Sequence, residues 1–410
     1  TLTGELDAGS LDVSGDIDVD GTSNLDIVDV DGAANFAADV TFADGADIIT
    51  ASAGTSNFRA GVNAGNSIQS GGNYNTVVGD EAGTAITTGD QNTFVGYAAG
   101  DVTTTSSNNT GIGNNALGGN ILGSYNVAIG KDSLEEMNPA TATDMYNTAV
   151  GAAAGQKVTT GTGNTLIGGL AGDALTTGND NVAIGKDALS ADTLGSGSVA
   201  IGLVALQDQN FTTATNAYNT AIGRSAGRDI TTGVNNVIIG ALAGDALTDA
   251  DLNVAVGKGA LTTDTLGSNS VAIGFAALEA QNFTTATDSY NTAVGSAAGA
   301  AVTTGVRNTF IGGLSGDALT TGLDNVAMGK SALSAETSGA RSVAIGSNSL
   351  TAQNVGSGTA VYNTAVGYDA GASVTTGIKN ILMGGLAGDA MTDADSNVAI
   401  GFESLTTNVL

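Results

Sequence analysis

Residues Asn164 to Asp180 read NTLIGGLAGDALTTGND, and this 17-residue unit decides the fold because variants of it fill most of the chain. Its core has the form Asn-Thr/Val-x-Val/Ile-Gly and recurs nineteen times. The closing glycines are evenly spaced over three steps, as in Gly151, Gly168, Gly185 and Gly202, and the fourth step, to Gly223, is four positions longer. This set of four steps then repeats as a super-period. A fixed short period is the signature of a solenoid, in which each repeat forms one coil.

The unit predicts short strands and no helix. Gly recurs several times per unit, and each Gly costs about 1 kcal/mol inside a helix. In a strand, successive side chains point to opposite faces, so Thr165 and Ile167 share one face and Leu166 takes the other. We expect Ile167, with its equivalents Ile184 and Ile201, to point into the coil. The predicted fold class is all-β, a parallel β-roll or β-solenoid of about 20 coils with a rise of about 4.8 Å per coil.

Two corners of the coil are predicted from the core motif. Asn opens sixteen of the nineteen cores, and Ser replaces it at Ser198, Ser270 and Ser342. We expect the Asn side chains to form a stacked ladder in which each amide bonds from coil to coil. The closing Gly is expected at the opposite corner, where positive φ or a close backbone approach excludes a side chain.

Residues 1–55 differ from the repeat domain, which we place at residues 56–410. The first 50 residues contain twelve acidic residues and no Lys or Arg, and their apolar residues alternate with Asp between glycine turns. We interpret them as an acidic β stem in which several chains pair. The stretch DIDVDG at 16–21 begins like an EF-hand calcium loop, but position twelve is Ile27 instead of Glu, so we interpret it as a solvated strand face.

The composition excludes several classes of function. The 410 residues include no His and no Cys, which removes a His general base, a Cys nucleophile and a zinc site of nitrogen and sulfur ligands. A net charge of −29 repels nucleic acid and anionic membranes, and no apolar run is long enough to span a membrane. We predict no enzymatic activity, no catalytic residue, no metal or other cofactor, no nucleic-acid binding and no membrane insertion.

A column of lysines is also expected on the surface of the roll. Lys186, Lys258 and Lys330 each follow a closing Gly and are separated from one another by one super-period. We interpret them as exposed charge that keeps the rod soluble and pairs with nearby Asp, in preference to a binding stripe.

The repeated cores SVAIG and NTAVG resemble the heads of trimeric autotransporter adhesins, whose chains form a left-handed parallel β-roll. The unit NTAVGAAAGQKVTTGTG, residues 147–163, is similar to repeats in phage tail-fibre proteins, and LDVSGDIDVDGTSNLDIVDVDG resembles fibre proteins of marine phages. The resemblance covers nearly the whole chain. The sequence contains neither the membrane-barrel anchor of the adhesins nor the chaperone domain often found at the end of phage fibres. Because the sequence starts and stops within its repeat pattern, we expect it to be a piece of a longer polypeptide.

The resemblance implies a homotrimeric virion fibre, in contact with other virion or fibre proteins, that attaches to a host-surface glycan or protein. Small residues at Ala153, Ala154 and Gly155, with Ala298 and Gly299 equivalent, are expected to let neighbouring chains approach. Two alternatives stay open. One is a bacterial surface adhesin or extracellular filament. The other is a phage spike that depolymerises polysaccharide with paired carboxylates. The acidic residues, however, recur with the repeat and do not form a single cluster.

The inserts that lengthen every fourth unit are the expected recognition sites. They run over residues 135–146, 207–218, 279–290 and 351–362. Loops on a rigid scaffold commonly carry function, and these hold rare aromatic residues that could stack on a sugar ring. The candidate receptor contacts are Asn210, Phe211, Tyr218, Asn282, Phe283, Tyr290, Tyr146 and Tyr362. The structural alternative is that each Tyr plugs the roll or a seam between chains.

Overall fold

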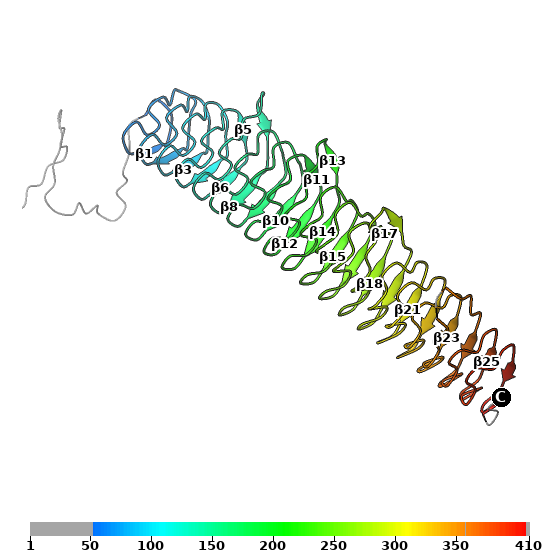
Figure 1. The fold of residues 1–410 in the computed structure, drawn as a ribbon. Helices are drawn as coiled ribbons and strands as arrows, with labels where there is room; N and C mark the ends of the chain where they lie inside the picture. Colours follow the sequence, from blue (N-terminus) through cyan, green and yellow to red (C-terminus); the bar gives the residue numbers. More distant parts are fainter. Residues whose placement is uncertain (1–51, 357, 407–410) are drawn as a thin grey trace, which may run out of the picture. The chain divides into compact units, whose positions relative to one another are not determined.

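The computed structural model describes residues 52–356 and 358–406, which form a parallel β-solenoid (Figure 1). The chain divides into two units, residues 1–48 and 49–410, and the described residues all belong to the second. The predicted acidic stem up to residue 51, including the stretch at 16–21, lies outside the described residues. None of the described residues is helical, so none forms a helix that could cross a membrane.

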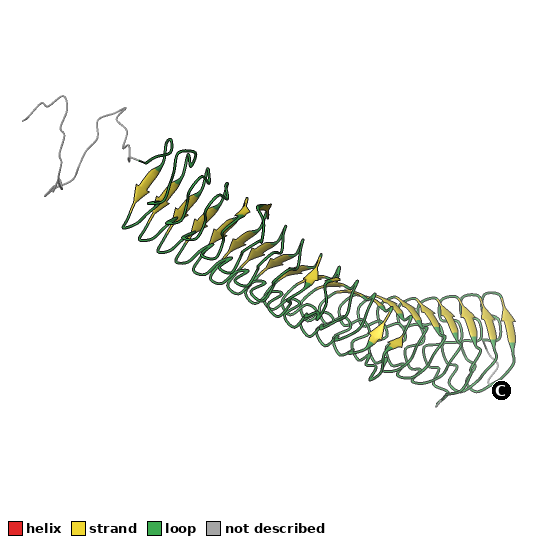
Figure 2. Cartoon of the chain, turned by 90° about the horizontal axis from the view of Figure 1, so that it is seen from above, coloured by secondary structure: helices red, strands yellow, loops and turns green. Residues whose placement is uncertain are grey.

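One three-residue strand from each coil joins a single 20-stranded parallel sheet (Figure 2). Neighbouring strands pair in register, so that Val182 is opposite Thr165 on one side and Val199 on the other. The strands of this main sheet are β1 (Phe58–Ala60), β2 (Thr76–Val78), β3 (Thr93–Val95), β4 (Thr110–Ile112), β6 (Val127–Ile129), β8 (Thr148–Val150), β9 (Thr165–Ile167), β10 (Val182–Ile184), β12 (Val199–Ile201), β14 (Thr220–Ile222), β15 (Val237–Ile239), β16 (Val254–Val256), β18 (Val271–Ile273), β20 (Thr292–Val294), β21 (Thr309–Ile311), β22 (Val326–Met328), β23 (Val343–Ile345), β24 (Thr364–Val366), β25 (Ile381–Met383) and β26 (Val398–Ile400).

The inserts add short strands beside the main sheet. Each of the first three inserts closes a two-residue parallel pair, and the fourth makes a single bridge between Ala340 and Ala360. These pairs are β5 (Gly123–Ser124) with β7 (Thr143–Asp144), β11 (Gly195–Ser196) with β13 (Thr215–Asn216), and β17 (Gly267–Ser268) with β19 (Thr287–Asp288). The predicted solenoid of about 20 coils, with its 17-residue repeat, is confirmed.

The inward face of each strand is opposite to the one we predicted. From β2 onward the middle residue of every main-sheet strand is buried. Leu166 in β9 and Ala183 in β10, for example, have no exposed surface. Ile167 is 37% exposed, and Ile184 and Ile201 are partly exposed, so all three point away from the coil. The expectation that these isoleucines fill the interior is wrong. Strand alternation alone separates the two faces of a strand but does not say which one is enclosed.

Most coils contain one large apolar side chain behind the strand, and its position alternates with the super-period. In two coils of every four, a glycine in left-handed conformation leaves room, and an apolar residue three positions later fills it, except after Gly100, where that residue is Thr103. Gly172 and Leu175 are such a pair, and a Cβ on Gly172 would lie 3.0 Å from the Leu175 side chain. In the other two coils a buried Leu, such as Leu189 at φ 54°, takes the glycine position, and a polar residue follows three positions later except at the first insert, where Met137 follows Leu134.

The predicted corners are confirmed. Asn164 donates its side-chain amide to Asn147 Oδ1 at 3.2 Å and to the carbonyl of Gly178 at 2.9 Å, and its own Oδ1 accepts from the backbone N–H of Asn181 at 3.0 Å. The closing Gly is closed to side chains, because a Cβ on Gly168 would lie 2.5 Å from the carbonyl oxygen of Gly185 in the next coil. Both corners therefore bond or pack coil to coil along the rod.

Four of the five small residues predicted to bring chains together lie inside their own coil, and the fifth, Ala153, is partly exposed. Ala154 and Ala298 have no exposed surface, and Gly155 and Gly299 are also buried. A Cβ on Gly155 would meet the side chain of Leu166 at 2.6 Å, so this glycine makes room for the chain's own core. The prediction that these residues form a face between chains is wrong for these four positions.

Candidate functional site

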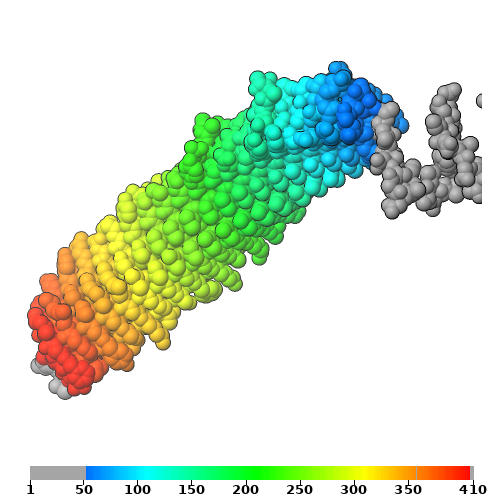
Figure 3. Space-filling model, turned by 180° about the vertical axis from the view of Figure 1, so that it is seen from behind, coloured from blue at the N-terminus to red at the C-terminus, as the bar shows by residue number. Residues whose placement is uncertain are grey.

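The four inserts form loops along the edge of the rod, away from the strands of the main sheet. Figure 1 shows β5, β13 and β17 on this edge, and Figure 3 shows the first and second inserts standing out from the surface. In the second and third inserts the tips, Thr212–Ala214 and Thr284–Ala286, are exposed. The second and third inserts therefore repeat one exposed loop four coils apart.

A buried carboxylate anchors each of the last three inserts. Asp192 has no exposed surface, and its Oδ1 accepts the N–H of Gly195 at 2.9 Å while Oδ2 accepts the amide of Gln209 at 2.6 Å. Burial raises the pKa of Asp192, and the N–H donors of Gln209 and Gly195 act to lower it. We name this pair of side chains a carboxylate clasp. It recurs one and two super-periods later as Asp264–Gln281 and Glu336–Gln353.

The glutamine of each clasp also replaces a missing member of the Asn ladder. Gln209 donates to Ser198 Oγ at 3.0 Å, and its carbonyl oxygen accepts from Asn219 Nδ2 at 2.8 Å. In ordinary coils an Asn carbonyl accepts that second bond, so the short side chain of Ser198 makes room for the glutamine. The first insert has neither change, because Asn126 keeps the ladder and Met137 occupies the glutamine position.

The phenylalanines among the predicted receptor contacts are inside the loops. Phe211 and Phe283 are each 5% exposed, so neither ring offers a platform for a sugar. Asn210 and Asn282 are exposed, and each side-chain carbonyl accepts a hydroxyl of the preceding coil, from Thr193 at 2.9 Å in the case of Asn210. The two phenylalanines therefore fill the loops and leave the two asparagines at the surface.

The tyrosines of the inserts lie beside the outward side of the main sheet. Tyr146, Tyr218, Tyr290 and Tyr362 are 60%, 58%, 57% and 51% exposed. Each tyrosine has a left-handed backbone conformation and immediately precedes a core Asn. Tyr146 stacks on Tyr125 of the preceding coil, with ring centroids 5.2 Å apart. The guanidinium of Arg341 lies 5.7 Å from the ring centre of Tyr362. None of these rings plugs the roll, and they form part of one exposed column.

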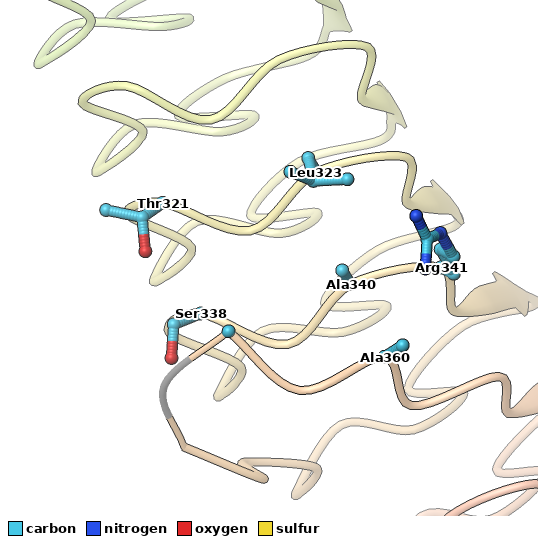
Figure 4. A pocket seen from close by; sticks show the side chains of 7 residues that line it. Thr321, Leu323, Ser338, Ala340, Arg341 and Ala360 are labelled. Atoms are coloured by element: carbon cyan, nitrogen blue, oxygen red, sulfur yellow. The ribbon is translucent and has the colours of Figure 1, made fainter.

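A shallow groove lies at the fourth insert, near the same column. It has a volume of about 130 Å³ and is lined by Thr321, Leu323, Ser338, Ala340, Arg341, Gly358 and Ala360 (Figure 4). In the figure the Arg341 side chain points toward the main sheet, away from Thr321 and Ser338. Because Arg341 contacts Asp324 and Tyr362, the groove gathers no cluster of free polar groups.

The outward side of the main sheet is a continuous row of uncharged, mainly apolar residues. We name it the outer sheet face and define it as the first and third residues of every main-sheet strand. From β2 to β26 these positions hold only Thr, Val, Ile and Met, and none is charged. Ile112, Ile222 and Ile311 are each 37% exposed and Met383 is 42% exposed. Contiguous apolar surface of this length on a folded chain indicates an interaction surface.

Charged residues lie beside this face and not on it. Lys186, Lys258 and Lys330 are exposed, as predicted for the lysine column. The predicted pairing with Asp holds for Lys186, which contacts Asp187 at 2.7 Å, and Lys258 and Lys330 form no ion pair within the described residues. Arg307 pairs with Asp324 at 2.7 Å, and this contact lowers the pKa of the Asp324 carboxyl. No group of three acidic residues among those described could hold a metal ion.

In comparisons with known proteins, no family model and no curated protein sequence matches the chain.

Proposed function

We propose that the chain is a structural and adhesive segment of a virion fibre, which three copies assemble into a rod that contacts the host surface without catalysing a reaction. The observation that carries this proposal is the solenoid itself, which repeats one exposed loop at every fourth coil on a rigid scaffold. The resemblance of the SVAIG and NTAVG cores to fibre and adhesin heads supports the virion location. Other fibre proteins are the expected partners at the ends of the rod.

The outer sheet face supports assembly from several copies. A monomer would expose an uncharged apolar strip along 20 strands, and removing such surface from water favours association. Four of the five small residues expected between chains are buried, so the outer sheet face takes their place in the proposal. The exposed tyrosines beside it then belong to the contact between chains, and host contact is left to the insert tips and to Asn210 and Asn282.

The first test is the mass of the assembly. The chain has a mass of 39.7 kDa, and light scattering during gel filtration is expected to give three times that value at micromolar concentration. The outer sheet face of each copy would then be covered. A stable monomer near 39.7 kDa would contradict the proposed assembly.

The second test changes the insert tips alone. In the second insert, Thr212→Gly, Thr213→Ser and Ala214→Gly reproduce the tip sequence of the fourth insert, and the same change is made at Thr284–Ala286. Because several weak sites act together, we expect binding to arrayed cell-surface polysaccharides of candidate hosts to fall at least about tenfold. The buried Phe211 and Phe283 stay in place, so the rod is expected to keep its melting temperature.

The matched control for the tips changes exposed threonines on ordinary turns, Thr160→Ser and Thr304→Ser. Binding that is equal in the tip variant and this control would place host contact elsewhere. Release of oligosaccharides from the arrayed polysaccharide by the unaltered chain would favour the depolymerase alternative.

A further inference from the structure

The second and third inserts carry one identical tip. Residues 209–215 and 281–287 both read QNFTTAT, although the two inserts differ just before this stretch, at Asp208 and Ala280. No other insert has this sequence, since the first reads MNPATAT and the fourth reads QNVGSGT at the same positions. A ligand that reached both tips would therefore meet the same chemical groups twice.

The asparagine of each tip is held in one orientation by the preceding coil. Thr193 donates its hydroxyl to Asn210 Oδ1 at 2.9 Å, and Thr265 donates to Asn282 Oδ1 at 3.1 Å. The backbone N–H groups of both asparagines donate to carbonyls of the following coil, at 2.9 and 3.0 Å. Both residues are exposed, and their Nδ2 atoms have no partner among the described residues. Each amide therefore presents unused N–H donors to the solvent.

Each tip offers hydroxyl and amide groups but no charge. In the second insert Thr212–Ala214 are exposed, and Thr215 closes the loop by donating its hydroxyl to the carbonyl of Thr213 at 3.0 Å. The third insert makes the same bond between Thr287 and Thr285 at 2.9 Å. Hydroxyl and amide groups can hydrogen-bond the hydroxyls of a neutral sugar as donors and as acceptors. Water competes for the same bonds, so one tip alone binds weakly.

The solenoid fixes the distance between the two tips, which lie on the same edge of the rod as β13 and β17 (Figure 1). Strands β14, β15, β16, β18 and β20 pair in register one after another, so four strand steps separate the two inserts. At about 4.8 Å per step the tips lie about 19 Å apart. The Asn ladder joins the intervening coils, with Asn236 bonded to Asn219 and Asn253 bonded to Asn236, so the interval is rigid.

We propose that the second and third inserts form a bivalent site that binds one linear, neutral polysaccharide lengthwise, and that the four-coil interval selects a polymer with a matching repeat. This inference rests on the proposed host contact and adds the charge, direction and period of the ligand. After one tip has bound, the second tip meets the same polymer at a high effective concentration. This gain requires the same sugar groups to recur about 19 Å along the polymer, at the position of the second tip.

The test changes the interval without changing either tip. Deleting residues 236–252 removes one ordinary coil and joins Asn235 to Asn253, so that three strand steps remain between the inserts. Duplicating the same residues gives five steps. Because each coil contacts its neighbours in the same register, both variants are expected to close into a solenoid. Circular dichroism checks that each variant keeps its strand signal.

The measurement is the affinity for fragments of graded length, prepared from an arrayed host polysaccharide that the unaltered chain binds. For the unaltered chain we expect the affinity to rise at least about tenfold once the fragments are longer than about 19 Å. Both interval variants should lose this rise. They should keep the affinity of the unaltered chain for short fragments, because each tip is intact.

The matched control deletes residues 380–396, the equivalent coil two super-periods later. This coil follows the fourth insert, so no interval between inserts changes and the rise should persist. A rise that persists equally in a folded interval variant would overturn the bivalent site and leave host contact at single tips. Absence of binding to any arrayed polysaccharide would contradict the proposed host contact and this inference together.

Discussion

Replacing Ala183 by Asp is expected to unfold the coils around β10, whereas replacing its neighbour Ile184 by Asp is expected to leave the solenoid folded. Ala183 has no exposed surface and stacks in register between Leu166 and Ala200. A carboxylate there would be enclosed without a partner, which costs several kcal/mol. Far-UV circular dichroism during heating is the measurement, and we expect Ala183→Asp to lose part of its strand signal at a lower temperature.

The Ile184→Asp variant is the matched control, because it adds the same charge one residue away on the outer sheet face. Its carboxylate can reach water in the single chain, so the strand signal should survive. In the assembly the same charge would be buried between chains, and light scattering should show dissociation. Equal loss of strand signal in both variants would mean that the interior and the outer face have been wrongly assigned.

The repeat alone predicted much of this fold. The spacing of the closing glycines gives the number of coils, and the constant Asn and Gly mark the two corners, because each residue has a backbone or side-chain property that few others share. The direction of the strand faces could not be obtained from alternation. Both sides of the core NTLIG are apolar, so a side buried in the coil and a side buried between chains look alike in one sequence.

The carboxylate clasps were missed although the sequence contains their signal. Each Ser that interrupts the Asn series is followed eleven residues later by Gln, as in Ser198 and Gln209, whereas Asn126 is followed by Met137. The acidic partner Asp192 precedes the Ser by six residues. This joint change shows that the positions depend on one another. Only the coil geometry explains it, since residues separated by 6, 11 and 17 positions meet at one corner of adjacent coils.

Gln209→Met is the second change expected to have a large effect. The glutamine amide donates to Asp192 and its carbonyl accepts from Asn219, and both partners are buried. Methionine fills a similar volume but cannot donate, so the carboxylate loses a donor in a site that water does not reach. We expect a loss of about 3 kcal/mol of local stability. Hydrogen exchange of the second insert and of β14 measures it without assuming that the whole rod unfolds in one step.

The first insert shows which two further substitutions should restore the stability of the Gln209→Met variant. At the first insert the same three positions are Asn120, Asn126 and Met137, and Asn120 accepts the N–H of Gly123 at 2.8 Å without a buried charge. Adding Asp192→Asn and Ser198→Asn to Gln209→Met recreates that arrangement at the second insert. Because the new Asn continues the ladder and the charge is gone, we expect the triple variant to recover protection to within about 1 kcal/mol of the unaltered chain. A triple variant as exposed to exchange as Gln209→Met alone would show that the clasp does not act as one unit.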